Sequence, residues 1–357
     1  MCESLSRCEN SGADSGSMAR NSRNGSKPVT EIPRSHSCGG DIFSPNTILA
    51  LRAGAEERDG AMRKILIGVA FVCCLFASSA QAATTLEILP THRQDRFTWN
   101  KAGLDGVPNI LSELKWENLR IYAIKGVLRH DTGRRTFLEA TGSFGWIYSG
   151  TNQDSDYDQN DRQDEYSRSY ANAGDGRVLD GSLAFGWKLQ ENAKQQTTLL
   201  GGYAINTQSL TMRELFNVIP AIGPYPGANT MYKAMWSGPW LGMEHSQELD
   251  KRTKLKLRLE YHLPHYRGEA HWNLRTDLAH PVTNNHWADG RGTVVSLGLE
   301  RSLGKYWSLG AAIDYTSYTA NRGTDQVNFA KIPKAQVPLN LVTWDSWAYR
   351  LMATYRF

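Results

Sequence analysis

The chain has 357 residues, 40% of them hydrophobic, and a formal net charge of +4. Because its Lys and Arg residues are scattered rather than gathered into a basic patch, nucleic acid is not an expected partner. All five cysteines lie within the first 74 residues, so the rest of the chain holds no disulfide framework, thiolate metal site or cysteine nucleophile.

The first 82 residues divide into two segments of different composition. Residues 1–61 are rich in Ser, Arg, Asn and Gly and show no apolar periodicity, a composition that cannot bury a core. Residues 62–82 combine a basic start, an apolar run from Ile65 to Ala77 and an Ala-Gln-Ala ending at Ala82, which predicts a secretory signal peptide. Signal peptides begin at the N-terminus, so we interpret residues 1–61 as a mis-assigned translation start, with a disordered extension as the alternative.

Residues 83–357 contain segments in which apolar and polar residues alternate with a period of two. In the clearest, Lys254–Leu263, every second residue is Leu or Tyr and the others are Lys, Arg, Glu or His; a helix would need a period near 3.6. In chain order we expect strands at Asp95–Leu104, Leu111–Leu128, Arg135–Ser149, Arg177–Leu189, Thr197–Leu210, Tyr232–Gln247, Lys254–Leu263, Gly292–Arg301, Trp307–Ala320 and Trp344–Phe357. These ten predict an all-β fold, a ten-stranded antiparallel transmembrane β-barrel over residues 83–357.

The connections between these strands alternate in length. Short polar turns are expected at His130–Arg134, Gln190–Gln195, Leu249–Thr253 and Leu303–Tyr306, and long loops at Gly150–Gly176, Thr211–Met231, Pro264–Arg291 and Asn321–Thr343. Barrels of the bacterial outer membrane have short periplasmic turns and long extracellular loops. We therefore expect the protein in the bacterial outer membrane, with outer-membrane lipid as a partner. We also expect the first and third long loops to lie on one extracellular rim. Aromatics near strand ends, among them Trp146, Trp236, Trp240, Trp307 and Trp344, are expected in interfacial girdles.

The first long loop is acidic, with Asp154, Asp156 and Asp158 at alternate positions. One interpretation is a solvated acidic loop. A second is a calcium site completed by Glu165, although the sixth position is Gln159 instead of the Gly that a tight calcium loop needs. A third is a catalytic carboxylate pair, because two close carboxylates repel, raise at least one pKa and can hold and polarise a water molecule.

The third long loop contains Glu269-Ala270-His271. In an extended segment, residues two positions apart point to the same side, so Glu269 could orient His271 as a general base. A zinc site formed by His262, His265 and His271 is an alternative, but no helical His spacing supports it.

Several ordered segments resemble the omptin family of ten-stranded outer-membrane endopeptidases. The segments that carry the resemblance are Ser112–Trp116, Ser149–Tyr157, Asp164–Arg168, Gly202–Tyr203 and Tyr232–Gly242. The resemblance implies that Asp154 and Asp156 are the catalytic aspartate pair and His271 the catalytic histidine, with Glu269 where the family has Asp. It also implies hydrolysis of a peptide or protein substrate by a water molecule held between the aspartates and the histidine.

Other positions depart from the omptin pattern. Arg267 stands where omptins carry an acidic residue that binds a basic substrate side chain, so a preference for Arg or Lys is not expected. Ile205 and Thr207 stand where omptins hold lipopolysaccharide with basic residues; a lipopolysaccharide requirement is unsupported, and no cofactor is indicated. The alternatives are a non-catalytic barrel of the same fold, acting as a surface-binding protein, adhesin or scaffold, and a small porin.

Overall fold

The computed structural model describes residues 83–192 and 194–357. The predictions of an N-terminal extension over residues 1–61 and a signal peptide over residues 62–82 lie outside the described residues. Among the residues described, no helix is long and apolar enough to cross a membrane.

Within this part of the chain, twelve antiparallel strands form one sheet. Their bounds are β1 Thr84–Lys101, β2 Ser112–Asp131, β3 Thr136–Gln159, β4 Gln163–Asn172, β5 Gly176–Glu191, β6 Gln195–Ile219, β7 Gly223–Glu248, β8 Thr253–His262, β9 His265–His271, β10 Asn284–Ser302, β11 Trp307–Val327 and β12 Ala335–Arg356. Two single 3₁₀ turns, η1 at Leu104–Gly106 and η2 at Asn160–Arg162, lie in the connections.

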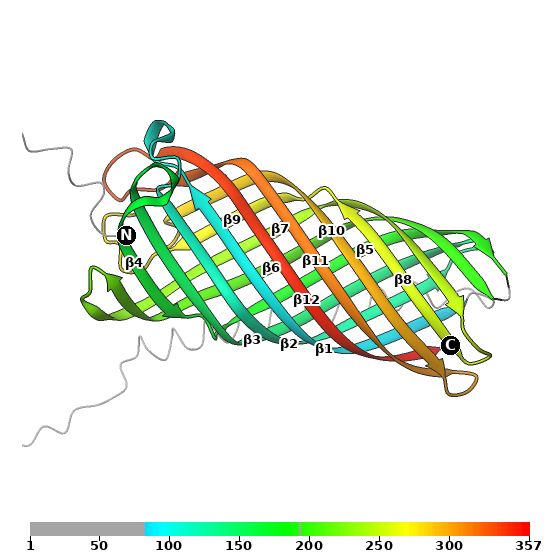
Figure 1. Cartoon of the computed structure of the whole chain (residues 1–357). Helices are drawn as coiled ribbons and strands as arrows, with labels where there is room; N and C mark the ends of the chain where they lie inside the picture. Colours follow the sequence, from blue (N-terminus) through cyan, green and yellow to red (C-terminus); the bar gives the residue numbers. More distant parts are fainter. Residues whose placement is uncertain (1–82, 193) are drawn as a thin grey trace, which may run out of the picture. The chain divides into compact units, whose positions relative to one another are not determined.

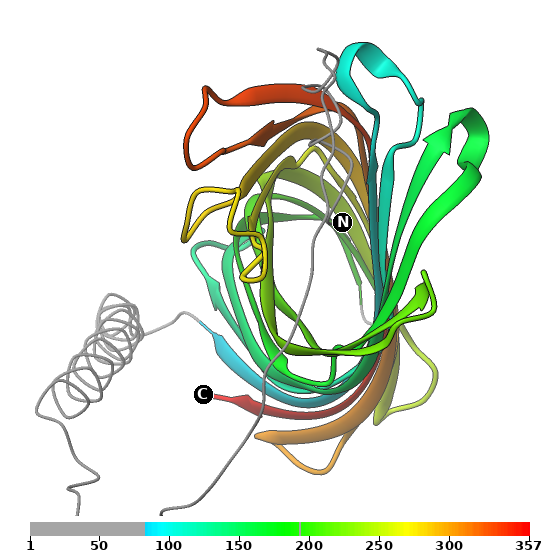
Figure 2. The same ribbon diagram turned by 90° about the vertical axis from the view of Figure 1, so that its left-hand side faces the viewer.

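The pairing closes the sheet into a barrel of ten strand positions. β4 and β5 are successive segments of one position, since both lie between β3 and β6. β8 and β9 likewise share the position between β7 and β10. β1 pairs with both β2 and β12, so every strand has two neighbours; Figure 2 shows the strands curving into a continuous wall. The predicted ten-stranded barrel is confirmed.

The two faces of the strands differ as the period-two pattern requires. Along β8, Leu257, Leu259 and Tyr261 are exposed on the outer face, while Arg258 and Glu260 point into the lumen. Exposed apolar side chains on other strands extend this face into an outer belt: Leu138, Phe144, Trp146 and Tyr148 on β3, and Val295, Leu297 and Leu299 on β10. An outward apolar band over a polar interior is typical of a barrel that crosses a lipid bilayer. On β3 the belt ends at Tyr148, so the rest of that strand lies beyond it.

The long connections are the main correction to the predicted elements. The short turns lie where the sequence places them, at the end of the barrel where the chain terminates (Figure 1). The four predicted long loops, by contrast, are largely strand, because β3, β6, β7, β10, β11 and β12 all continue past the belt. Backbone groups still need hydrogen-bond partners there, but the outer face no longer meets lipid, so the apolar alternation that marks a strand fades.

Aromatic side chains fill the lumen just beyond the belt. This aromatic layer consists of Phe97, Trp99, Trp116, Tyr232, Trp236 and Tyr266, all fully buried. Phe97 on β1 and Tyr232 on β7 come from opposite sides of the barrel, yet their ring centroids are 5.7 Å apart. Trp236, Trp240 and Trp344 were expected in the girdles but are buried inside; Trp146 and Trp307 are exposed on the outer face.

Candidate functional site

Asp154 and Asp156 lie on β3 rather than in a loop, which corrects the interpretation of a solvated acidic loop for these two residues. Asp154 pairs with Leu114 and Ser169, while Asp156 pairs with Ser112 of β2. The two side chains are 7% and 3% exposed, and because they are two positions apart on a strand they share one face.

A register irregularity explains why that face is the inner one. Below the belt edge the odd-numbered residues of β3, such as Glu139 and Ile147, are buried. The pairing with β2 shifts around Arg120, opposite Ser149, as at a β-bulge, where one extra residue reverses which side chains face inward. Beyond the shift the even-numbered Asn152 and Asp154 are buried while Thr151 and Gln153 are less so, and from Asp154 to Tyr157 both faces of the strand are buried.

The electrostatic surroundings of Asp154 favour its protonated form. Burial and the neighbouring charge of Asp156 raise the pKa of Asp154 from about 3.8 to about 7, while the positive charge of Lys101 acts in the opposite direction. Within the described residues, Oδ1 of Asp154 is buried without a hydrogen-bond partner. Two adjacent carboxyl groups in an enclosed site, one of which exchanges its proton near neutral pH, are the arrangement used to hold and activate water.

Glu269 and His271 lie on another part of the wall, on β9. They share a face of that strand, as predicted, but it is the face opposite to the buried Tyr266 and Ala270. Glu269 is exposed, and within the described part of the chain no hydrogen bond or ion pair joins it to His271. His271 Nδ1 instead donates to the carbonyl oxygen of Pro281 at 2.7 Å, which leaves Nε2 as the basic nitrogen of the neutral ring.

A buried cluster near the aspartate pair was not identified from the sequence. Asp325 of β11 accepts hydrogen bonds from Lys101 Nζ at 2.7 Å and from Asn284 Nδ2 at 2.9 Å. His286 Nε2 lies 3.3 Å from Asp325, and its Nδ1 lies 2.7 Å from the Tyr232 hydroxyl. Burial alone would raise the pKa of Asp325, but Lys101 and His286 hold that pKa well below its usual range.

The register connects this Asp325 cluster to the aspartates. Lys101 is paired with Ser112, and Ser112 with Asp156, so three strands present these residues at one level. The parts of β10 and β11 that carry Asn284, His286 and Asp325 were predicted as loops, and the sequence contained no other signal that would bring them together.

The proposed metal ligand sets are dispersed. Among residues 83–192 and 194–357, no group of three or more His, Cys, Asp or Glu side chains could hold a metal ion. For the calcium interpretation, Asp158 is exposed while Asp154 is buried, and Glu165 pairs with Arg168. For the zinc interpretation, His262 contacts Glu260 in the lumen, whereas His265 contacts Asp289 on the outer face.

Comparison with known protein families assigns the chain to a family of outer-membrane proteins. The sequence profile of the family described as Protochlamydia outer membrane protein (Pom) matches residues 88–357, about three quarters of the chain. The chain belongs to this family. No curated protein sequence matches it. The Pom assignment covers all of β2 to β12, including the aspartate pair.

Solved structures share the fold. The outer membrane protease OmpT from Escherichia coli superposes with a TM-score of 0.66 at 14% sequence identity, covering 78% of this chain and 98% of OmpT. The translocator domain of the autotransporter NalP from Neisseria meningitidis gives a TM-score of 0.34 at 15% identity, covering 86% of this chain and 98% of that domain. OprG from Pseudomonas aeruginosa gives a TM-score of 0.29 at 10% identity, covering 77% and 95%.

These comparisons confirm the predicted location and fold. The Pom family and the OmpT-like architecture make this protein an outer-membrane β-barrel. At 14% identity the likeness to OmpT concerns the fold alone, and the family shown by the sequence is Pom; the resemblance to omptin sequences stays a prediction.

Proposed function

We propose that this barrel is an outer-membrane endopeptidase of the omptin type, with Asp154 and Asp156 holding the water that attacks the peptide bond. The observation that carries the proposal is the buried carboxylate pair beyond the membrane belt, with the pKa of Asp154 raised to about 7 by burial and by Asp156. The OmpT-like fold supports it, because the pair lies on β3 of a barrel whose architecture is similar to that of a protease.

In the proposed reaction, water adds to the carbonyl carbon without a covalent enzyme intermediate. Its proton passes to the ionised carboxylate of the pair, and the protonated carboxyl of the pair gives its proton to the departing amine as the C–N bond breaks. His271 is left out of this transfer, because it lies on the face of β9 opposite to the buried Tyr266 and Ala270 and its Nδ1 donates to the Pro281 carbonyl at 2.7 Å. Because Arg267 is exposed on the same face of β9, substrates with a basic side chain beside the cleaved bond are not preferred.

The test is cleavage of a diverse peptide library by the full barrel, refolded in detergent with lipopolysaccharide. Removing a group that acts in proton transfer costs about 100-fold or more, so Asp154→Asn should lower kcat/KM by that factor, whereas His271→Ala, on the opposite face of β9, should not. Asp158→Asn is the matched control, since Asp158 lies on the same strand but is exposed, and it should cleave normally.

The outcomes separate the parts of the proposal. Absence of cleavage by the unmodified protein would end it. A loss of about 100-fold in His271→Ala as well would show that the histidine reaches the bound water, and would return the proton transfer to it.

A second candidate is a non-catalytic surface-binding barrel. The outward position of Glu269, without contact to His271, favours it. Under this alternative the buried aspartates are only part of a ligand-binding wall, and Asp154→Asn changes no reaction rate because there is none.

A further inference from the structure

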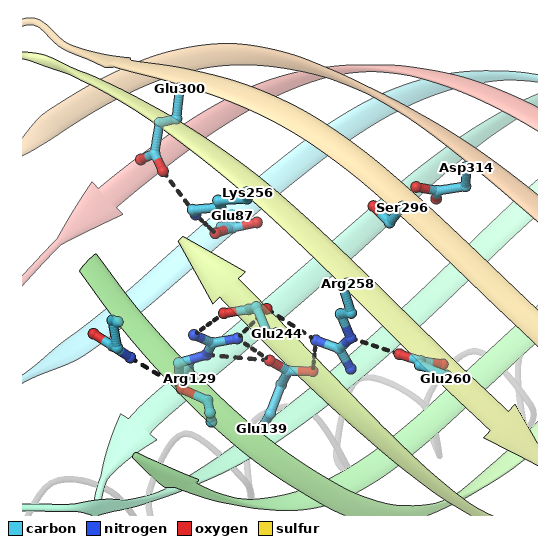
Figure 3. Close-up of polar contacts among 12 residues, drawn as sticks. Glu87, Arg129, Glu139, Glu244, Lys256, Arg258, Glu260, Ser296, Glu300 and Asp314 are labelled. Atoms are coloured by element: carbon cyan, nitrogen blue, oxygen red, sulfur yellow. Dashed lines mark hydrogen bonds and ion pairs between the residues drawn. The ribbon is translucent and has the colours of Figure 1, made fainter. Parts of the chain in front are cut away.

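The barrel encloses a cavity of about 220 Å³ inside the membrane-spanning part. Its wall is charged, and most of those charges are already paired. Arg129 contacts Glu139 and Glu244, Arg258 contacts Glu139, Glu244 and Glu260, and Lys256 contacts Glu87 and Glu300 (Figure 3). These residues come from β1, β2 and β3 on one side and from β7, β8 and β10 on the other, so contacts across the lumen neutralise most of its charge.

Lys125 of β2 is the exception in this wall. Its side chain lines the cavity, but within the described residues no carboxylate lies within 4.0 Å of its Nζ and no hydrogen bond reaches it. The charged groups that act on it most strongly are Arg350, Asp314, Arg258 and Glu260. Among these, Arg258 is already paired with Glu139, Glu244 and Glu260, so Lys125 itself is the charge that this end of the cavity leaves without a direct partner.

Arg350 of β12 supplies a second uncompensated donor to the same cavity. Its Nη2 donates to Asp314 and, at 3.0 Å, to Ser296. The Arg350 side chain is only 9% exposed, and its Nε–H is buried without an acceptor. Burying a donor from a charged group without a partner is costly, and an ammonium without a counter-charge in an enclosed space is costlier still.

We propose that Lys125 and Arg350 form a binding site for a small inorganic oxyanion of the phosphate type. Tetrahedral oxyanions accept charge-assisted hydrogen bonds from Lys and Arg side chains, which matches the free ammonium and the orphaned Nε–H. Drug-sized ligands need about 300–1,000 Å³, so a cavity of about 220 Å³ favours an ion over a peptide or a sugar. The aromatic layer fills the lumen between this cavity and the far ends of the strands.

This site is independent of the proposed peptidase, because it lies on the other side of the aromatic layer. The direct test is isothermal titration of inorganic phosphate into the full barrel, refolded in a zwitterionic detergent. The unmodified protein should bind one phosphate per chain in a saturable way. Lys125→Met should weaken binding at least about 10-fold, and Arg350→Lys, which keeps a cation beside Asp314 but lacks the Nε–H, should weaken it less.

Lys251→Met is the control for loss of one positive charge, since Lys251 is exposed in the turn between β7 and β8, and it should bind like the parent. A second measurement needs no variant: saturating phosphate should slow acetylation of Lys125 by acetic anhydride, followed by mass spectrometry, and leave Lys251 unaffected. Equal binding by Lys125→Met and parent, no saturable binding by the parent, or acetylation of Lys125 that phosphate does not slow would each overturn the proposal.

Discussion

Buried carboxylates in two regions of this barrel have opposite surroundings. In the membrane-spanning lumen, Glu139 is 2% exposed and contacts both Arg129 and Arg258. Beyond the belt, Asp154 is 7% exposed, and after burial the strongest influence on its pKa is the like charge of Asp156. A paired buried charge makes the loss of its partner costly, whereas a buried charge beside a like charge lowers stability and has a shifted pKa that suits it to proton transfer.

The largest effect should come from breaking the paired region. Glu139→Ala leaves Arg129 and Arg258 with Glu244 as their shared carboxylate, and removal of one partner from a buried ion pair costs about 3–5 kcal/mol. Urea unfolding in detergent, followed by tryptophan fluorescence, measures the loss. Glu248→Ala, at an exposed pair with Lys254, is the control and should cost at most about 1 kcal/mol. Similar losses in both variants would contradict the assignment of the lumen network as a stabilising element.

A smaller effect of opposite sign is expected at Asp154. Because its pKa is raised to about 7, the folded protein binds the proton more tightly than the unfolded chain, so stability falls as the pH rises from about 4 to about 7. Asn cannot ionise, so Asp154→Asn should be more stable than the parent by at most about 4 kcal/mol at about pH 8 and equally stable at about pH 3.

The measurement is the urea midpoint at both pH values, with Asp158→Asn as the control that should not differ from the parent. A stability gain that is the same at acidic and alkaline pH would show that charge repulsion in the aspartate pair is not its cause.

The smallest effect is expected on the outer face. Glu269→Ala removes an exposed side chain without a described contact, and such surface changes usually stay within about 0.5 kcal/mol. Thermal unfolding compares it with the parent. A loss above about 1 kcal/mol would mean that Glu269 is held by His271 after all, and would restore the orienting role that the sequence suggests.

The sequence predicted the strands of the belt well, because lipid on one side and a polar lumen on the other impose a period of two. Lys254–Leu263 matches β8 almost residue for residue. Beyond the belt this contrast ends, so β9 and the upper parts of β10 and β11 read as loops.

The candidate site was predicted only in part, because it lies beyond the belt, where the period of two is lost. Asp154 and Asp156 were singled out by their spacing, which survives in any extended backbone, and their catalytic role stays a prediction. That they face inward depends on the register shift opposite Arg120, and alternation alone cannot reveal a bulge. The Asp325 cluster joins residues from β1, β10 and β11 that no local pattern links, and the buried Trp236 and Trp344 show that an aromatic near a strand end can serve either face.

The pairing of β1 with β12 has a consequence for how the protein is made. Thr85 lies opposite Arg356, so contacts between the most distant parts of the described chain complete the wall. Such non-local contacts make folding slow, and until they form, both outermost strands are open edges that can pair with other chains. A chain shortened before β12 would therefore have two such edges rather than a smaller barrel, and we expect it to aggregate instead of inserting.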